Sequence, residues 1–273
     1  MRTSDRVLTN VVRGRSSSTG RATRLHGAQS PAQVVILAAG MGTRLGRSAP
    51  KPLTQLQDGR SILERQLDCL RAVLGTEASV TAVVGYRGKK IMKAAPDLLF
   101  AYNPEYKTTN TSKSLLRALR TSREGGVLWL NGDVVFDPAV LELALPFLRA
   151  DQSFVCVDTN TVAEEEVKYT LDEDGFVDEL SKTVVGGLGE AVGINHVSAT
   201  DKATLIEHLR ACGDQDYFER GIETAIESAG LRFRPVDISA YAAVEVDFET
   251  DLHRANAMLG EIGLDPAAAV EAG

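Results

Sequence analysis

The amino-acid sequence predicts an α/β protein with a doubly wound, mostly parallel mixed sheet. Short apolar, β-branched runs alternate along the chain with stretches of helical periodicity, which is the pattern of β-α-β units. The 273 residues are 44% hydrophobic and 25% charged, so the chain can bury a substantial core. We therefore expect one domain over residues 31–263.

The first half of this domain predicts regular alternation. Residues 34–39 are a continuous apolar run typical of a buried strand, and residues 61–74 place Ile62, Leu67, Leu70 and Leu74 on one side of a helix. Strands are expected next at residues 80–86 and 98–102, the second after a short helix. A helix at residues 110–121 and a strand at 127–134 follow.

The second half is more mixed. Residues 153–157, 167–171 and 190–197 have strand patterns, whereas residues 204–212 and 218–230 have helical ones. Strands at residues 232–238 and 243–246 are expected to complete the sheet, and residues 250–262 to close the domain as a helix. The sequence contains no internal repeat.

The two ends of the chain differ from the domain. The first thirty residues carry six arginines against one acid, Asp5, and a polar run from Ser16 to Gly20. A transit peptide has this composition, as does a disordered arm or an over-long start, and we expect a disordered basic N-terminal arm. Residues 264–273 are expected to form a flexible tail.

Charge and hydropathy exclude several classes of partner. With 30 Lys plus Arg against 37 Asp plus Glu, the formal net charge is -7, so no basic footprint for nucleic acid is expected. No apolar run reaches the roughly 18 residues of a membrane span. Cys69, Cys156 and Cys212 lack metal-ligand spacing and are expected to be reduced core residues. We expect a cytoplasmic protein, monomeric or homodimeric, with small-molecule substrates.

A glycine-rich loop follows the first predicted strand. Glycines stand at positions 40, 42 and 46, followed by a lysine between Pro50 and Pro52. Ligands bind at the carboxyl ends of strands in such sheets, and glycine lets backbone N–H groups approach phosphate oxygens. The loop therefore predicts a phosphate cradle, with Arg44 and Lys51 supplying full positive charges.

Two common glycine-rich motifs do not match this loop. In a dinucleotide-binding fingerprint Leu45 would occupy the third glycine position, and the second strand ends too late for its acidic residue. A P-loop requires Gly-Lys-Ser/Thr, which this loop lacks. Gly40-Met41-Gly42-Thr43-Arg44 followed by Pro50-Lys51-Pro52 instead resembles the signature of the sugar-phosphate nucleotidyltransferase superfamily. The resemblance implies its Rossmann-like nucleotide-diphospho-sugar transferase fold.

Two further carboxylates suit a metal site. Asp133 ends an apolar strand, the place expected for a Mg²⁺ ligand that faces the phosphates. Glu245 and Asp247 share one face of a later strand because side chains alternate with period two. The family resemblance implies that Asp133 and Asp247 hold Mg²⁺ between them. As an alternative, each acid is a strand-end turn residue or a helix cap.

More motifs narrow the resemblance to cytidylyltransferases that act on phosphocholine and on aminoethylphosphonate-type compounds. They are Asn103-Pro104 with Tyr106, Thr109-Asn110, Ser114-Leu115, Val84-Gly85-Tyr86, Glu166-Val167-Lys168, Leu180-Ser181-Lys182, Gly189-Glu190 and Tyr217-Phe218-Glu219. The similarity places Gly85, Asn110 and Ser114 along the base and ribose, and Lys182 at the acceptor's phosphate. Asn110 as a helix cap and Lys182 as a surface lysine remain alternatives.

The predicted site has three groups besides the metal ligands. The catalytic residues are Arg44 and Lys51. The nucleotide-binding residues are Leu37, Ala38, Ala39, Gly40, Gly42, Thr43, Arg44, Gly85, Tyr86, Asn110, Ser114 and Asn131. The acceptor-binding residues are Lys182, Glu190, Tyr217 and Glu219.

The predicted reaction is transfer of CMP from CTP to a small acceptor. A quaternary ammonium favours an aromatic cage and a primary amine favours carboxylates, so phosphocholine, an aminoalkyl or hydroxyalkyl phosphonate, and a sugar or cyclitol phosphate all stay open. A sugar-phosphate enzyme using UTP, ATP or dTTP is the first alternative, and a non-catalytic nucleotide-sensing domain the second.

Overall fold

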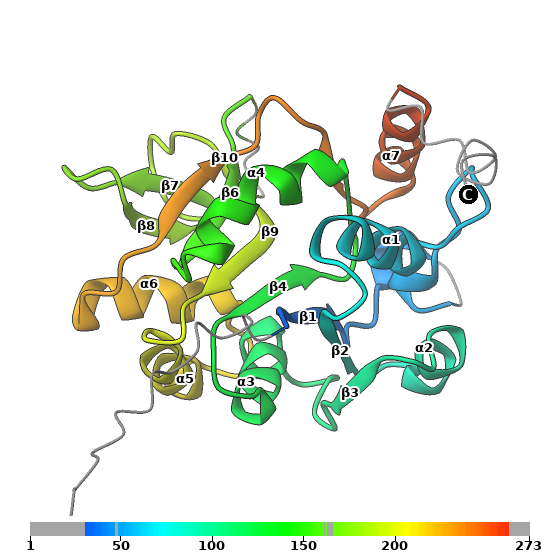
Figure 1. Cartoon of the computed structure of the whole chain (residues 1–273), viewed down its shortest axis with the longest axis horizontal. Helices are drawn as coiled ribbons and strands as arrows, with labels where there is room; N and C mark the ends of the chain where they lie inside the picture. The colour runs from blue at the N-terminus through cyan, green and yellow to red at the C-terminus, as the bar shows by residue number, and fades with distance from the viewer. Residues whose placement is uncertain (1–30, 47–48, 161, 163–165, 262–273) are drawn as a thin grey trace, which may run out of the picture. The chain divides into compact units, whose positions relative to one another are not determined.

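The computed structural model describes residues 31–46, 49–160, 162 and 166–261. The predictions for residues 1–30 and 264–273 lie outside these residues. The central feature is a nine-stranded sheet whose main path runs β10-β6-β9-β4-β1-β2-β3, with β7 and β8 attached beside β9. The predicted α/β class with a mostly parallel mixed sheet is confirmed (Figure 1).

Parallel strands make up the half of the sheet that carries the glycine loop. Strand β1 (Gln33–Ala38) lies between β2 (Ser79–Val84) and β4 (Val127–Asn131), and β2 pairs with the edge strand β3 (Leu99–Tyr102). All three pairings are parallel. Their carboxyl ends therefore meet at one edge of the sheet.

The other half of the sheet is mixed. Strand β9 (Glu190–Val197) runs antiparallel between β4 and β6 (Phe154–Asp158), and β10 (Arg234–Asp237) pairs in parallel with β6. The hairpin of β7 (Lys168–Leu171) and β8 (Val177–Ser181) joins the start of β9. Because β9 is antiparallel, its first residues lie at the edge where the parallel strands end.

Helices cover both faces of the sheet (Figure 1). Side chains of α1 (Ile62–Leu74), α2 (Gly88–Ala94) and α4 (Pro138–Arg149) pack on one set of alternating strand residues, which includes Ile36. Those of α3 (Thr111–Thr121), α5 (Lys202–Ala211) and α6 (Phe218–Ala229) pack on the other set, which includes Trp129. Alternation along each strand produces these two apolar clusters.

Three sequence expectations need correction. The predicted strand at residues 127–134 is two strands, β4 and β5 (Val134–Phe136), and β5 leaves the main sheet to pair with β11 (Ala243–Glu245) in a separate two-stranded sheet. Residues 243–246 therefore do not complete the main sheet. Strand β8 and helix α4 were not predicted.

A third apolar cluster joins this small sheet to the last helix. Buried side chains of α7 (Glu249–Glu261) pack with Val135, Val244 and Leu45, the last of which follows the glycine loop. The carboxyl-terminal helix thereby holds the small sheet against the start of the domain. This packing matters for the site because Asp247 lies between β11 and α7.

Two of the three cysteines lie in the core as expected, and Cys212 does not. Cys69 and Cys156 are buried, Cys212 is half-buried, and all three are free. Burial raises the pKa of the Cys69 thiol to about 12.

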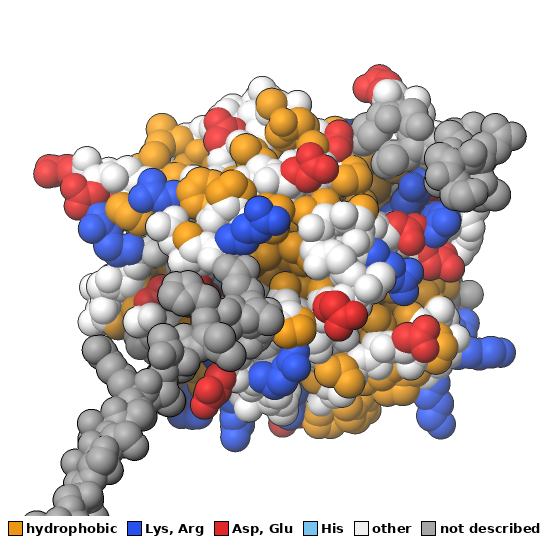
Figure 2. Space-filling view, in the orientation of Figure 1, with side chains coloured by type: hydrophobic (Ala, Val, Ile, Leu, Met, Phe, Trp, Pro, Cys, Tyr) orange, Lys and Arg blue, Asp and Glu red, His pale blue; other side chains and the backbone are white. Residues whose placement is uncertain are grey.

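On the face in Figure 2, acidic and basic side chains are interspersed among the described residues, so this face offers no basic surface for a nucleic acid. No helix in the described part of the chain has the length and apolarity to span a bilayer.

A capping box begins α1. Ser61 Oγ accepts from the backbone N–H of Glu64 at 3.3 Å, and Glu64 Oε2 accepts from the Ser61 N–H at 2.7 Å. Replacing Ser61 with alanine is expected to lower the free energy of unfolding by about 1 kcal/mol, because a buried helix N-terminus loses a hydrogen-bond acceptor. Urea unfolding measures it, with the exposed Glu77→Gln as the control. An unchanged midpoint for Ser61→Ala would contradict the assignment.

Candidate active site

The carboxyl ends of β1, β2 and β4 are held together by backbone hydrogen bonds. The Gly132 N–H donates to Leu37 O at 3.0 Å, and the Tyr86 N–H donates to Ala39 O at 3.0 Å. A Cβ on Gly85 would lie 2.8 Å from Ala39 O and 2.5 Å from Tyr106 Cβ. The chain segments that follow the three strands therefore start from one closely packed edge.

The glycine loop is open at one glycine and tightly packed at another. A Cβ on Gly40, which follows Ala38 and Ala39, would meet no atom of the described residues within 4 Å. Gly42 has a φ of +56°, and a Cβ there would lie 3.0 Å from Lys51 Cβ. Gly42 thus lets the backbone turn against Lys51, whereas Gly40 leaves free space beside the backbone. Thr43 and Arg44 follow in a short 3₁₀ turn.

Lys51 links the two predicted metal ligands. Its Nζ donates to Asp133 Oδ2 at 2.7 Å and also to Asp247 Oδ1. Arg44 donates to the other oxygen of Asp247 at 2.6 Å. The side chain of Lys51 is 11% exposed, against 54% for Arg44. Four predicted residues, separated by up to about 200 positions in sequence, thus form one charged cluster.

The cluster stabilises its own charges. Burial opposes the charge of Lys51, but Asp133 and Asp247 outweigh it and raise the pKa of Lys51 above its usual value. Partial burial opposes the ionisation of Asp247, but the hydrogen bond and charge of Lys51, with Arg44 nearby, lower the pKa of Asp247. Lys51 and Asp247 are therefore held in their charged forms near neutral pH, as a site for a metal triphosphate requires.

The break between β4 and β5 brings the two aspartates together. Asp133 lies in this break, and its backbone O accepts from the Val246 N–H at 3.0 Å, which places Asp247 alongside. Gln66 of α1 donates to the carbonyls of Asn131 and Val134, one on each side of the break. The strand break, although not predicted, is what positions the pair.

Two carboxylate groups that contact the same lysine ammonium make this cluster suitable for Mg²⁺. Asp133 and Asp247 both contact the ammonium of Lys51, so they can approach one small cation, and carboxylate oxygens are preferred Mg²⁺ ligands. Among the described residues no group of three or more His, Cys, Asp or Glu side chains is arranged to hold a metal. The remaining ligands would have to come from phosphates and water, as is usual for Mg²⁺.

Glu245 was missing from the predicted site residues. Its Oε1 accepts from Asn131 Nδ2 at 2.9 Å, and Asn131 Oδ1 is buried without a hydrogen-bond donor among the described residues. A Cβ on Gly193 of β9 would lie 2.4 Å from Asn131 Nδ2. Burial, followed by the charge of Asp133, raises the pKa of Glu245. The alternation of Glu245 with Asp247 was the sequence signal that could have found it.

Beyond β2, the predicted nucleotide-binding residues Tyr86, Asn110 and Ser114 each contact other residues of the fold. Tyr86 lies 6.4 Å from Tyr106, ring centre to ring centre. Asn110 caps α3 by accepting from the Thr111 N–H and donates to Gln215 O. Ser114 is buried and accepts from Asn103 Nδ2 at 3.2 Å. Asn110 and Ser114 therefore have structural hydrogen bonds, and their contact with a nucleotide stays a prediction.

The predicted acceptor residues gather beside the start of β9. Glu190 is its first residue, and its backbone lies opposite Asp158 of β6 and Lys168 of β7 in the sheet. Lys182 follows β8, and its Nζ lies 5.1 Å from the ring centre of Tyr217, the N-cap of α6. Glu219, in the first turn of α6, is 7% exposed.

Aromatic residues do not form a separate cage among these groups. Phe154 and Phe218 are fully buried, and Tyr169 is 3% exposed, within the apolar clusters described above. Phe176 is covered by the guanidinium groups of Arg232 and Arg234. Packing therefore accounts for these four residues, while Tyr217 is 39% exposed beside Lys182.

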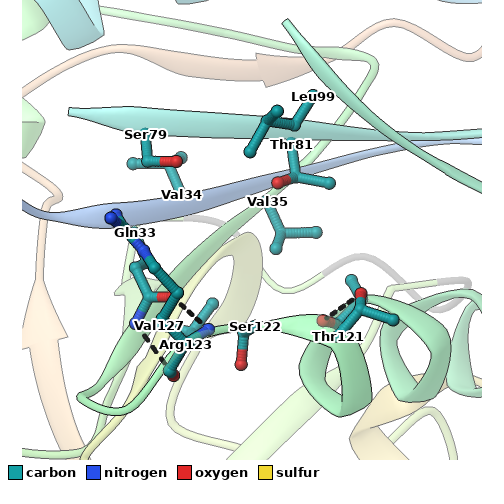
Figure 3. Close-up of a pocket in the computed structure, with 11 residues that line it drawn as sticks. Gln33, Val34, Val35, Ser79, Thr81, Leu99, Thr121, Ser122, Arg123 and Val127 are labelled. Carbon is teal, nitrogen blue, oxygen red and sulfur yellow. Dashed lines mark hydrogen bonds between the residues drawn. The ribbon is translucent and has the colours of Figure 1, made fainter.

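A hollow of about 160 Å³ lies at the opposite ends of the strands (Figure 3). Gln33, at the beginning of β1, accepts from the Arg123 N–H at 2.7 Å and donates to carbonyls of residues 123, 124 and 126. The side-chain amide of Gln33 therefore binds the backbone of the loop before β4. This hollow is distinct from the charged cluster.

The fold and the cluster define an α/β protein in which a glycine-rich loop faces paired carboxylates across two cationic side chains. The chain belongs to the MobA-like NTP transferase domain family, whose profile matches residues 34–227.

A relative in Streptomyces rubellomurinus, CMP-5'-(3-aminopropyl)phosphonate synthase, is 30% identical over an alignment of 251 residues that covers 83% of this chain and 38% of the relative. The bifunctional protein GlmU of Acaryochloris marina is 34% identical over 130 residues, 46% of this chain and 28% of that protein. The chain thus spans less than half the length of these two curated relatives.

Solved structures share the fold at low sequence identity. The inositol-1-phosphate CTP transferase of T. maritima superimposes with a TM-score of 0.71 and 16% identity, covering 86% of this chain and 97% of that one. The CTP:phosphocholine cytidylyltransferase of Streptococcus pneumoniae gives a TM-score of 0.67 and 17% identity, covering 84% and 99%. The predicted fold class and family resemblance are confirmed.

Proposed function

We propose that the chain is a CTP-dependent nucleotidyltransferase that transfers CMP to a small phosphate or phosphonate acceptor and releases pyrophosphate. The observation that carries this proposal is the ammonium of Lys51 between Asp133 and Asp247, directly behind the glycine loop. CTP and a phosphonate acceptor are supported by the relative whose name includes CMP and aminopropylphosphonate, which matches most of this chain.

In the proposed reaction, an oxygen of the acceptor's phosphate or phosphonate forms a bond to the α-phosphorus of CTP. The bond from that phosphorus to the oxygen bridging the β-phosphate breaks, and its electron pair leaves with pyrophosphate. The attacking oxygen is already anionic near neutral pH, so the reaction requires no general base. The protein's task is to hold two anions in line and to neutralise their charge.

Each cation of the cluster has a separate part in this task. Lys51, nearly buried and firmly charged, would contact the α-phosphate region, where negative charge develops. Arg44, which is more exposed, would bind the outer phosphates together with backbone N–H groups of the glycine loop. Asp133 and Asp247 would hold Mg²⁺, which supplies further neutralisation of the triphosphate when bound.

The remaining predicted residues would hold the two substrates. Gly85, Tyr86 and Asn131 stand at the ends of the strands that flank the loop, where the base and ribose would lie. Lys182 is the cation available for the phosphate or phosphonate of the acceptor. Glu190, Tyr217 and Glu219 surround that position and would contact the rest of the acceptor.

A matrix of four nucleoside triphosphates against phosphorylated acceptors, read by pyrophosphate release with Mg²⁺, tests the proposal. The acceptors are 3-aminopropylphosphonate, 3-hydroxypropylphosphonate, phosphocholine and glucose 1-phosphate. Release with CTP and one of the first three supports it. Preference for glucose 1-phosphate with UTP, ATP or dTTP would replace it by the sugar-phosphate alternative, and no release in any combination would favour a non-catalytic nucleotide sensor.

Gly40 offers a separate test of the phosphate cradle. Gly40→Ala is expected to leave the free energy of unfolding nearly unchanged, because the new methyl group lies within 4 Å of no atom in the part of the chain that the structure describes. It should nevertheless raise the Kd of CTP about tenfold, since the methyl group occupies the space through which phosphate oxygens approach the backbone. Calorimetric titration with CTP measures this. CTP binding at wild-type affinity would remove Gly40 from the cradle.

A further inference from the structure

The acceptor side of the site contains a buried carboxylate with an unused oxygen. Glu219 is 7% exposed, and its Oε2 is buried with no hydrogen-bond donor in the part of the chain that the structure describes. Its position in the first turn of α6 favours a negative charge. A buried acceptor without a donor is costly to keep in a folded protein, so its presence here suggests that a ligand supplies the donor.

Two charged side chains, Lys182 and Glu166, act on the carboxylate of Glu219. Burial raises the pKa of Glu219 to about 7, its own backbone N–H and Lys182 lower the pKa, and Glu166 raises it. Glu166 in turn has its pKa raised by burial and by Glu190. No ion pair within 4.0 Å joins Lys182 to Glu219 among the described residues, and the Lys182 ammonium lies over the ring of Tyr217 instead. Lys182 acts on both Glu219 and Glu166 without an ion pair to Glu219, so the carboxylate of Glu219 can receive a further cation.

We infer that Glu219 receives a primary ammonium group of the acceptor, so that the site selects aminoalkyl phosphonates or phosphates. This inference rests on the proposed function, in which Lys182 meets the phosphonate end of the same molecule. An ammonium N–H supplies the missing donor and adds a positive charge beside the buried carboxylate. A hydroxyl supplies a donor without a charge, and a trimethylammonium supplies a charge without a donor. Only the primary amine meets both requirements of Glu219.

The test compares two acceptors that differ at one end. Calorimetric titration with CTP present and Mg²⁺ left out, so that turnover does not contribute heat, measures binding of 3-aminopropylphosphonate and 3-hydroxypropylphosphonate to the wild type and to Glu219→Gln. Pyrophosphate release with Mg²⁺ gives kcat/KM for each. The wild type should prefer the amine. Glu219→Gln should weaken amine binding and its kcat/KM by about 10- to 100-fold, with less than about a threefold change for the hydroxyl compound.

Glu223→Gln is the matched control. Glu223 lies one turn later on α6, is 8% exposed and pairs with Arg220 at 2.5 Å. Its loss should change the stability of the helix without changing the ratio of amine to hydroxyl binding. Thermal unfolding of both variants shows whether either change acts through the fold.

Two results would overturn the inference. One is equal binding of the amine and the hydroxyl compound by the wild type. The other is an equal loss for both compounds in Glu219→Gln, which would make Glu219 a structural residue. Failure of the proposed function is recognised separately, as absence of pyrophosphate release from any acceptor, because the titration reports the ammonium preference whether or not turnover occurs.

Discussion

Lys51→Met is expected to lower kcat for pyrophosphate release by on the order of 10²-fold or more, the loss typical of one preorganised group that stabilises developing charge. Methionine keeps the length and the apolar stem of lysine but removes the ammonium that joins Asp133 to Asp247. The α-phosphate would then face those carboxylates without a protein cation between them.

Steady-state kinetics at saturating CTP and Mg²⁺ measures the effect of Lys51→Met. Lys93→Met is the control, because Lys93 is exposed on α2 and the same change of side chain there should leave kcat unaltered. Circular dichroism of both variants establishes that they fold. Near-normal turnover of Lys51→Met would remove Lys51 from the mechanism.

Gly132→Ala is expected to damage both the fold and the site. A Cβ at this position would lie 2.6 Å from Leu37 O, 3.1 Å from Pro52 Cγ and 3.3 Å from Ala38 Cα. Two of these atoms belong to the backbone of β1, which is paired on both sides and cannot move aside easily. We expect a loss of about 1–3 kcal/mol in the free energy of unfolding, the usual cost of overpacking.

Activity should fall further than stability does in Gly132→Ala. Gly132 directly precedes Asp133, so a displaced backbone moves that carboxylate away from Lys51. Urea unfolding and pyrophosphate release, both measured below the unfolding transition, separate the two effects. Gly40→Ala serves as the control for stability, since the same methyl group there has no neighbour within 4 Å among the residues that the structure describes. A Gly132→Ala variant as stable and active as the wild type would show that the strand break is not rigid.

Sequence reasoning succeeded where the signal is local. The apolar run of β1, the glycines after it and the cap of α1 at Ser61 all act within a few residues, so their pattern is readable without the fold. The position of the glycine loop follows from the rule that ligands bind at the carboxyl ends of parallel strands. The convergence of Lys51, Asp133 and Asp247 was expected because their motifs resemble those of a known superfamily.

The missed elements lack such local patterns. Helix α4 is apolar on most sides and contains Pro146, which obscures its periodicity, although Asp137 and Pro138 are a helix-start signal. Strand β8 has buried residues only at Val177 and Leu180, so it does not alternate with period two.

By itself, then, the sequence determined the class of sheet and the cradle, because these depend on periodicity, glycine and strand ends, and the resemblance of its motifs to a known superfamily supplied the pairing of Asp133 with Asp247. Tertiary structure alone decided that the strand breaks at Gly132, where the chain crosses the Leu37 carbonyl and turns to pair with β11. It also decided that Glu245 meets Asn131 and that one oxygen of Glu219 is buried without a donor. These features arise from contacts between segments about a hundred residues apart, which no local pattern encodes.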